Sequence, residues 1–516
     1  MVWLNFMIDI TREFWGDFGI SSLFCLALIA IFVFARDRFA KSLLGIYGLV
    51  MLIVIYNPLT YYICKLFMEE TTFQQYYQRF FGLIPVAAII AAAVIFLIKK
   101  TDLTGIKKFA CLIIAGLLIV ILGHPIYQED WYTKAENRNK VPQDVVTICD
   151  LFADYEGDEI RIMAPQDIAV YLRQMDTRFS MAYARSLPKE AYELTNEIPD
   201  VEVVADYCKN HNIEYVVVSA IDSTLGGYLN YGFKLYGRTP YYAVLTPNDP
   251  NWILTEYGDE SGLQGLCYTL HNRKDDTLIV FDGGHVENET ILRDAIKEHG
   301  GQVDAWIITH FHKDHVDAFN EIYANPNGIT IDQVYTTPME PDFYHSIAKE
   351  WDDIESFDRF VEITKDANNI NYVSRDDVLT FSDGLKVTFL NAFDEVVDSY
   401  REDIPNDGAL VTRIETEDRS ALLVSDCHTG HMAEYFVDTY GDKLDADILQ
   451  PGHHGNNSMP IESGFYELVS PEVTIFDLPT DMLTSPQYTA GALAAFLQEM
   501  GSRIVWYNTA PNVFGL

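Results

Sequence analysis

The sequence predicts a multi-domain protein: transmembrane helices in residues 1–125, a small α/β domain in 126–250, and a larger domain of strands and helices in 251–516. Long apolar runs are confined to the first part, and alternating helical and strand-like patterns begin after it. Several strand-like segments of the last part end in histidine or aspartate. A chain of 516 residues is also too long for one ordinary domain.

Four apolar stretches predict the transmembrane helices, at residues 18–35, 43–63, 80–98 and 106–123. Each is close to the roughly 20 residues that cross a bilayer core. Asn57-Pro58 interrupts the second and predicts a kink. A signal peptide does not fit, because several spans follow and no basic segment precedes the first. We therefore expect a multi-pass protein of the cell membrane, with anchoring and a transport or partner-binding role both left open.

Charged loops predict the orientation of these helices. The short loops at 35–41 and 99–108 are strongly basic, whereas 69–79 carries few basic residues. Basic loops remain in the cytoplasm, so both termini and everything after about residue 125 are expected to be extracytoplasmic.

Composition limits the classes of partner and cofactor. The formal net charge of −39 disfavours stable nucleic-acid binding, which normally shows a basic patch. It does not exclude a nuclease, because bound metal ions add positive charge that the count omits. The seven cysteines have no paired spacing, so neither a disulfide framework nor a cysteine metal site is predicted.

The middle part alternates strands and helices. Residues 158–165 predict a strand and turn, 204–220 a helix and a buried strand, and 232–245 a β-hairpin. The runs "RIMAPQDIAVYLRQMDTRFSMAYARS" and "YGFKLYGRTPYYAVL" resemble the soluble tail of bacterial envelope proteins of the glycosyltransferase-C type. That resemblance says nothing about catalysis, and a spacer or interaction domain is the expected role.

A cluster of histidine and aspartate lies in "AWIITHFHKDHVDA", where a buried strand at 305–309 runs into a polar loop. His310 and His312 are two residues apart and can point the same way from extended backbone. Asp314 and His315 follow directly and could serve a second ion. Imidazole and carboxylate are the ligands expected of zinc or a similar ion, so the loop predicts a metal site.

Three further strand-like segments end in the same residue types. "DTLIVFDGGH" ends at Asp282, "SALLVSDCHTG" at Asp426, and "ADILQPGHHGNN" at His453 and His454. A carboxylate such as Asp426 has two oxygens and can span a pair of ions.

The H-x-H-x-D-H pattern, followed by these motifs in this order, is similar to the metallo-β-lactamase fold, with αββα layers, over residues 251–516. The resemblance implies two divalent ions, expected to be Zn²⁺ with Mn²⁺ as the alternative. It implies that Asp282 supports the metal loop and that Asp426 bridges the ions. One of His453 and His454 would bind the second ion, with a slight preference for His453.

One departure from that family concerns the first metal site. Many members have a further histidine, but this chain has none between His345 and His428, and "NDGALVTRIE" occupies the place. The extracellular hydrolase domain of competence DNA-uptake proteins is similar in this respect. Asn406, Asp407 or water would then complete the site with an oxygen ligand. The departure argues against a β-lactamase or a glyoxalase.

Other histidines fit a metal role less well. His428 and His431 are expected on a helix that follows Asp426, and His285 fits a surface position equally. The insertion at 336–366 is acidic, aromatic and helical in pattern, and it fits a substrate entrance or a solvated helix. His345 within it is not expected to be a ligand.

The resemblance implies metal-assisted hydrolysis outside the cytoplasm, with Asp314 or Asp426 orienting a metal-activated hydroxide. The substrate class expected is a phosphodiester, such as a cell-envelope polymer. An extracellular nuclease is the alternative enzyme. A non-catalytic envelope-assembly or sensing protein with a ligand-binding metal domain is the alternative from another class.

Overall fold

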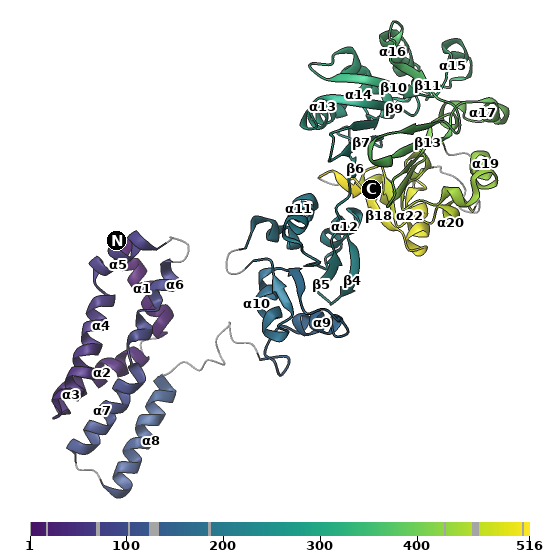
Figure 1. Cartoon of the computed structure of the whole chain (residues 1–516). Coiled ribbons are helices and arrows are strands. Elements are labelled where there is room, and N and C mark those ends of the chain that lie inside the picture. The colour runs from purple at the N-terminus through teal and green to yellow at the C-terminus, as the bar shows by residue number, and fades with distance from the viewer. Residues whose placement is uncertain are drawn as a thin grey trace. The chain divides into compact units, whose positions relative to one another are not determined.

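The computed structural model describes residues 2–16, 19–68, 73–101, 104–122, 134–183, 187–427, 430–456, 464–507 and 510–516. The chain divides into two compact units, Met1–Ala135 and Glu136–Leu516 (Figure 1).

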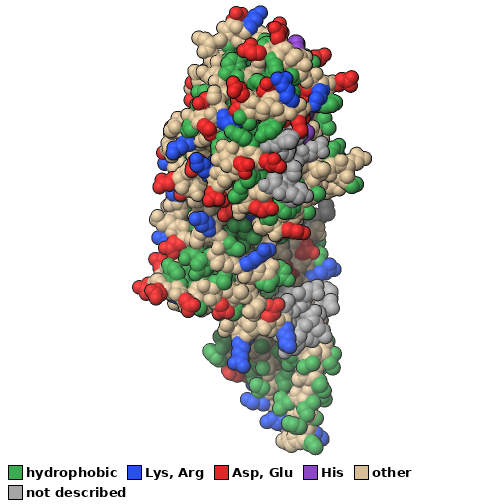
Figure 2. Space-filling view, turned by 90° about the vertical axis from the view of Figure 1, so that its right-hand side faces the viewer, with side chains coloured by type: hydrophobic (Ala, Val, Ile, Leu, Met, Phe, Trp, Pro, Cys, Tyr) green, Lys and Arg blue, Asp and Glu red, His purple; other side chains and the backbone are tan. Residues whose placement is uncertain are grey.

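The first unit is helical in its described part. Its helices are α1 (Val2–Trp15), α2 (Gly19–Phe34), α3 (Arg38–Ala40), the π-helix η1 (Lys41–Ile46), α4 (Tyr47–Ile55), α5 (Pro58–Phe67), α6 (Phe73–Gln78), α7 (Val86–Lys100) and α8 (Gly105–Leu122). Hydrophobic side chains are spread over the surface of this unit (Figure 2). An apolar surface of that extent is typical of contact with lipid rather than water.

Two stretches of helix are long and apolar enough to cross a membrane, Phe73–Lys100 and Gly105–Leu122. Two bent pairs meet the same test only together, α1 with α2 at 91° and α4 with α5 at 64°. The predicted count of four is therefore reached only if each bent pair is one span. The predicted kink is present: α4 ends at Ile55, and Asn57 caps the start of α5, where its side chain accepts a hydrogen bond from Leu59 N at 2.8 Å.

The second unit begins with a five-stranded sheet in the order β2-β1-β3-β5-β4. Strands β1 to β3 are parallel, and β5 and β4 extend the sheet antiparallel. The strand, helix–strand unit and hairpin predicted from the sequence are all present. The elements are α9 (Gln143–Leu151), β1 (Ile160–Met163), α10 (Gln166–Met175), β2 (Phe179–Met181), the 3₁₀ segment η4 (Lys189–Thr195), α11 (Val201–His211), β3 (Tyr215–Ser219), α12 (Asp222–Asn230), β4 (Lys234–Arg238) and β5 (Tyr242–Thr246).

Two seven-stranded sheets follow. The first has the order β11-β10-β9-β8-β7-β6-β19 and the second β12-β13-β14-β15-β16-β17-β18. The last strand, β19, returns to the first sheet and pairs antiparallel with β6. The strands are β6 (Trp252–Glu256), β7 (Cys267–Asn272), β8 (Leu278–Asp282), β9 (Gln302–Ile308), β10 (Thr330–Thr336), β11 (Ile370–Tyr372), β12 (Val378–Thr380), β13 (Lys386–Asn391), β14 (Val411–Glu415), β15 (Ser420–Leu423), β16 (Ile448–Gln450), β17 (Val473–Phe476), β18 (Arg503–Trp506) and β19 (Asn512–Gly515).

Side-chain alternation arranges these sheets in four layers. Phe281 and Ile307 of the first sheet share a buried cluster with Phe389 and Leu423 of the second, so the two sheets pack face to face. Neighbouring residues such as Trp306 point the opposite way, into a cluster with the flanking helices. The layers are therefore helix, sheet, sheet and helix, which is the order that the motif resemblance implies.

The flanking helices cover the outer faces of the two sheets (Figure 1). They are α13 (Glu289–Glu298), α14 (Lys313–Ala324), α15 (Pro341–Ile347), α16 (Ile354–Thr364), α17 (Glu395–Tyr400), α18 (Ile404–Asp407), α19 (Gly430–Tyr440), α20 (Phe465–Val469), α21 (Thr480–Thr484) and α22 (Ala490–Glu499).

Candidate metal centre

The metal loop lies at the carboxyl end of β9. This buried strand ends at Ile308, and α14 begins at Lys313, so only a short loop separates strand and helix. His310 and His312 lie in the loop, while Asp314 and His315 lie in the first turn of α14. All four side chains are buried, and His315 is completely inaccessible to solvent. The strand and the helix therefore hold the four side chains in one place.

Two groups of ligand atoms meet at this loop. His310, His312 and Asp426 form one group, and all three offer atoms within 4.8 Å of one another. Asp314, His315, Asp426 and His454 form the second by the same measure. Asp426 belongs to both groups.

The two oxygens of Asp426 face different groups. Its Oδ1 is 3.1 Å from His315 Nε2 and 3.4 Å from His454 Nε2. Its Oδ2 is 3.8 Å from His310 Nε2 and 3.7 Å from His453 Nε2. A carboxylate whose oxygens are divided in this way would reach two ions at once.

Asp282 holds the metal loop from the end of β8. Its Oδ1 accepts a hydrogen bond from Thr309 N at 2.7 Å, and its Oδ2 accepts one from Thr309 Oγ1 at 2.6 Å. The same Oδ2 is 2.6 Å from His315 Nδ1. A carboxylate on Nδ1 fixes the proton there and leaves the Nε2 lone pair directed at the second group.

The buried polar atoms of the site fit metal binding. The Nε2 atoms of His310, His312, His315 and His454 are buried without a hydrogen-bond partner in the described part of the chain, as is Asp426 Oδ1. A buried polar atom without a partner is costly, and so many in one place are rare. Divalent ions would give these atoms the partners that the protein does not.

Protonation states in the site follow from its charges. Burial and the neighbouring His315 hold the pKa of His310 well below its ordinary value, so its imidazole is neutral at neutral pH. Burial acts to raise the pKa of Asp426, but the nearby histidines, His315 first, outweigh it and hold that pKa well below the ordinary value. A neutral imidazole and an ionised carboxylate are the forms that bind metal.

His315 and His454 are the two imidazoles that can carry a proton beside the buried carboxylates. Burial acts to lower the pKa of each, but the neighbouring carboxylates together outweigh it and raise both pKa values: Asp426 with Asp282 for His315, and Asp426 with Asp314 for His454. Protons on these imidazoles would then balance the buried carboxylates, and metal binding would release them.

Four residues beside the candidate ligands have an uncommon backbone conformation. Asp282, Ser425, His453 and His454 all have positive φ angles between 50° and 54°. Such angles are uncommon for residues other than glycine and persist where the surroundings impose them. Their clustering beside the candidate ligands indicates that the fold holds these side chains in position.

The structure distinguishes the two adjacent histidines. His454 is buried and belongs to the second group, whereas the side chain of His453 is 28% exposed and faces Asp426 Oδ2 on the other side. The two therefore approach opposite oxygens of Asp426. The geometry places His454, rather than the slightly preferred His453, with Asp314 and His315.

The segment expected to replace the missing histidine lies beside the metal loop. Leu410 N donates to Thr309 O at 3.0 Å, and Asn391 Nδ2 donates to Asp407 O at 2.7 Å. Asn406 and Asp407 are buried in α18. Neither side chain belongs to either ligand group of the described residues.

The remaining histidines of this domain lie outside the two ligand groups or outside the described residues. His345 is exposed and pairs with Asp358 at 2.7 Å, away from the ligand groups. His285 is only 6% exposed, so the surface alternative for it is wrong; it begins a loop that Asp259 holds by accepting a hydrogen bond from its backbone N. His428 and the side chain of His431 lie outside the described residues.

Two buried aspartates beside the ligands were not predicted. Asp352 Oδ1 is 3.4 Å from His312 Nε2 and comes from the 336–366 insertion. Asp477 Oδ2 is 3.9 Å from His454 Nδ1, and its Oδ1 accepts a hydrogen bond from Tyr268. Asp477 follows the buried strand β17, so the strand-end rule that finds Asp282 and Asp426 would also have found it. Asp352 does not follow a buried strand, so the sequence gives no comparable reason to select it.

No protein-family model and no curated protein matches the chain. Among solved structures, it is similar to the metallo-beta-lactamase fold protein YhfI from Bacillus subtilis, at 14% identity and a TM-score of 0.33, over 52% of this chain and 99% of that one. It is also similar to Zn²⁺-bound PqqB from Methylobacterium extorquens, at 12% identity and a TM-score of 0.33, over 51% and 100%. A third is CmlA, a diiron β-hydroxylase from Streptomyces venezuelae, at 12% identity and a TM-score of 0.34, over 62% and 60%. At these low identities the chemistry of the site has to follow from its own side chains.

Proposed function

We propose that this chain is a membrane-anchored, metal-dependent hydrolase of the metallo-β-lactamase fold that cleaves phosphodiester bonds outside the cytoplasm. The observation that carries the proposal is the pair of buried ligand groups that share Asp426. Bound divalent ions, Zn²⁺ or Mn²⁺, would supply hydroxide at neutral pH and neutralise charge on the substrate oxygens.

Each candidate ligand has a place in this proposal. His310, His312 and Asp426 would hold one ion, and Asp314, His315, Asp426 and His454 the other. His453 would complete the first site, because its Nε2 faces the same Asp426 oxygen as His310 does. His453 would then replace the family histidine that this sequence lacks, and no oxygen ligand from Asn406 or Asp407 would be needed.

The protein side chains have separate tasks in hydrolysis. Asp426, kept ionised by the histidines around it, would orient the attacking hydroxide. Asp282 keeps the lone pair of His315 directed inward. Asp314, also in the second group, would assist Asp426 at the nucleophile.

The phosphodiester class is supported by the motif order and by the missing histidine, which separate this chain from β-lactamases and glyoxalases. A cell-envelope polymer is the preferred substrate because the apolar helices would keep the enzyme at the membrane. The net charge of −39 counts against DNA or RNA as a tightly held substrate. A nuclease and a non-catalytic ligand-binding protein remain the competing functions.

The test uses the full-length protein in a non-ionic detergent, with metal content and hydrolysis of bis(4-nitrophenyl) phosphate measured together. We expect about two ions per chain. Asp426→Ala should retain one or none and lose activity by about 100-fold or more. His453→Ala should lose about one ion, and the exposed His345→Ala should keep both.

The outcomes separate the competing functions. Two ions without hydrolysis of any diester would favour the ligand-binding protein. Preference for DNA over simple diesters would favour the nuclease. Absence of metal after zinc and manganese are supplied would contradict all three.

A further inference from the structure

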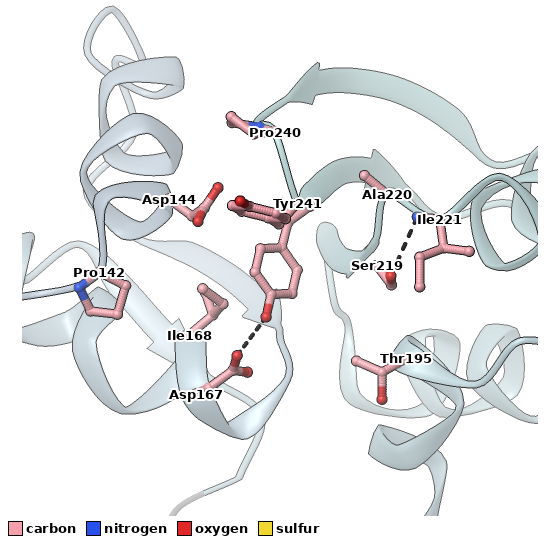
Figure 3. Close-up of a pocket in the computed structure, with 11 residues that line it drawn as sticks. Pro142, Asp144, Asp167, Ile168, Thr195, Ser219, Ala220, Ile221, Pro240 and Tyr241 are labelled. Atoms are coloured by element: carbon pink, nitrogen blue, oxygen red, sulfur yellow. Dashed lines mark hydrogen bonds between the residues drawn. The ribbon is translucent and has the colours of Figure 1, made fainter. Parts of the chain in front are cut away.

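A cavity of about 410 Å³ lies in the five-stranded sheet domain, outside the metal centre. Its lining includes Asp144, Asp167, Ser219, Ile221, Tyr241 and Tyr242 (Figure 3). Cavities of this size accommodate small organic ligands. Neither the metal centre nor its proposed hydrolysis gives this cavity a role.

The cavity lies where the order of the strands reverses. From β1 the chain passes through α10 to β2 on one side, and β3 then pairs with β1 on the other side. Asp167 follows the carboxyl end of β1, and Ser219 forms the carboxyl end of β3. Crevices at such reversal points are the usual ligand sites of α/β sheets.

Three helices begin at the cavity, and none has a capping side chain. The residues before α9, α10 and α12 are Pro142, Pro165 and Ile221, and none of them forms a side-chain cap hydrogen bond. The first backbone N–H groups of a helix have no partner within the helix. The helix starts therefore offer hydrogen-bond donors, with about half a positive charge each.

Two carboxylates offer the matching acceptors. Asp144 and Asp167 lie in the first turns of α9 and α10. Asp144 Oδ1 is buried and has no hydrogen-bond partner among the described residues. Asp167 Oδ2 accepts a hydrogen bond from the hydroxyl of Tyr242, another lining residue, and this bond holds the Tyr242 ring in place. The two negative charges and the three helix starts nearly balance, so the lining offers donors and acceptors without strong net charge.

An exposed aromatic ring completes the lining. Tyr241, in the turn between β4 and β5, is 72% exposed, and its ring lies beside Asp144 in Figure 3. Ser219 adds a hydroxyl on the opposite side of the cavity. A flat ring beside donors and acceptors matches a sugar, whose C–H faces pack on aromatic rings while its hydroxyls donate and accept.

We propose that this cavity binds a neutral sugar, with Asp144 and Asp167 accepting its hydroxyl hydrogens and Tyr241 packing against its ring. An anionic ligand would meet two carboxylates, and no lysine, arginine or histidine is among the described lining residues. A cationic ligand would meet three helix starts. The site would give the chain a hold on a glycan that is independent of the metal centre.

The test measures binding to the full-length protein in non-ionic detergent, by ligand-observed NMR. The probes are glucose, galactose, mannose and N-acetylglucosamine, with glucose 6-phosphate and glucosamine as charged counterparts. At least one neutral sugar should bind with a Kd near about 1 mM, as expected for a ligand of this size. Both charged counterparts should bind several-fold more weakly.

Variants tie the binding to the cavity. Asp144→Asn keeps the shape but weakens the acceptor, and Tyr241→Ala removes the ring, so each should raise Kd by about tenfold. The control Asp158→Asn changes an exposed carboxylate of the same domain outside the cavity and should leave Kd unchanged. Metal content should stay the same in all three variants, so failure here is distinct from failure of the hydrolase proposal.

Three results would overturn the proposal. Tighter binding of glucose 6-phosphate would make the cavity an anion site at helix starts, and tighter binding of glucosamine would make it a cation site. Absence of binding by every neutral sugar at about 50 mM would remove the sugar site altogether.

Discussion

At the candidate metal centre, the role of each side chain follows from the residues that it contacts. Asp426 gives one oxygen to each ligand group, so its loss would affect both. Asp282 belongs to neither ligand group but fixes Thr309 and the candidate ligand His315 through three contacts of 2.6–2.7 Å. The positive φ of Asp282 shows that its backbone is also held in an uncommon conformation for this purpose.

Asp282→Asn tests this supporting role. In asparagine the side-chain oxygen can still accept a hydrogen bond from Thr309, but an amide NH₂ group takes the place of the second oxygen. An NH₂ group cannot accept a hydrogen bond from His315 Nδ1, so the imidazole loses its fixed orientation. We expect metal affinity to fall by about 10- to 100-fold with the fold retained. Competition with a chelating dye measures the affinity, and circular dichroism monitors the fold.

The matched control for this change is Asp332→Asn, an exposed aspartate on β10 that accepts a hydrogen bond from Gln302 at 2.9 Å. Its metal affinity should equal that of the unmodified chain. Equal affinity in Asp282→Asn as well would show that His315 is oriented by its packing alone.

At the scale of elements, the site is assembled from the ends of strands. β8, β9, β15 and β16 each lead directly into a ligand or a supporting residue. The turn after β16 is the tightest part, because His453, His454 and Gly455 have positive φ in succession. Gly455 permits close approach, since an added Cβ would lie 2.3 Å from the ring of Phe476.

Gly455→Ala should therefore displace the histidine turn. The clash with the buried Phe476 forces the backbone to move, and His454 moves with it, so we expect loss of about one ion per chain and a lower Tm. Gly328→Ala is the matched control, because it has a φ of +90° but open space around the added Cβ. It should reproduce the cost of the backbone conformation without the loss of metal. Equal metal loss in both would rule out the clash as the cause.

The sequence predicts most of the candidate ligands and the strand ends on which they lie, but it does not predict which side chains contact one another. His310, His312, Asp314, His315 and Asp426 meet because each lies at a strand end or the following turn, a pattern that hydrophobic periodicity exposes. The different directions of His453 and His454 depend on two consecutive positive φ angles, which no propensity encodes. Asp352 reaches His312 from a distant insertion, and such long-range contacts have no local signal. The bend between α4 and α5 follows from Asn57-Pro58, which the sequence does reveal, whereas the 91° bend between α1 and α2 was not predicted.

At the scale of the whole molecule, the sheet domain and the domain with the metal centre form one compact unit. Arg273, after β7, bonds to Glu202 of α11 at 2.8 Å and to Asp249 at 2.6 Å, and it also pairs with Asp206. Arg503 of β18 and Arg419 both bond to Asn230 at the end of α12. Because α12 begins at the proposed sugar cavity, these contacts link the helix at the cavity with the second seven-stranded sheet, from which the candidate ligands Asp426 and His454 come.

Arg273→Ala should weaken this link. The change leaves three carboxylates without their shared cation, so we expect the unit to lose about 1–2 kcal/mol of stability and to become more open to proteolysis near residues 246–252.

Burial acts to raise the pKa of Asp249, but Lys209 and Arg273 outweigh it and lower that pKa. A lowered pKa stabilises the folded state above the unfolded value near 3.8 and ceases to do so as the pH falls through the folded value. The stability difference between the unmodified chain and Arg273→Ala should thus be constant from about pH 5 upward and shrink below about pH 4. Thermal unfolding across this range measures it, with Arg359→Ala, an exposed arginine on α16, as the control. A difference that grows as the pH falls would contradict the ionic link between the two domains.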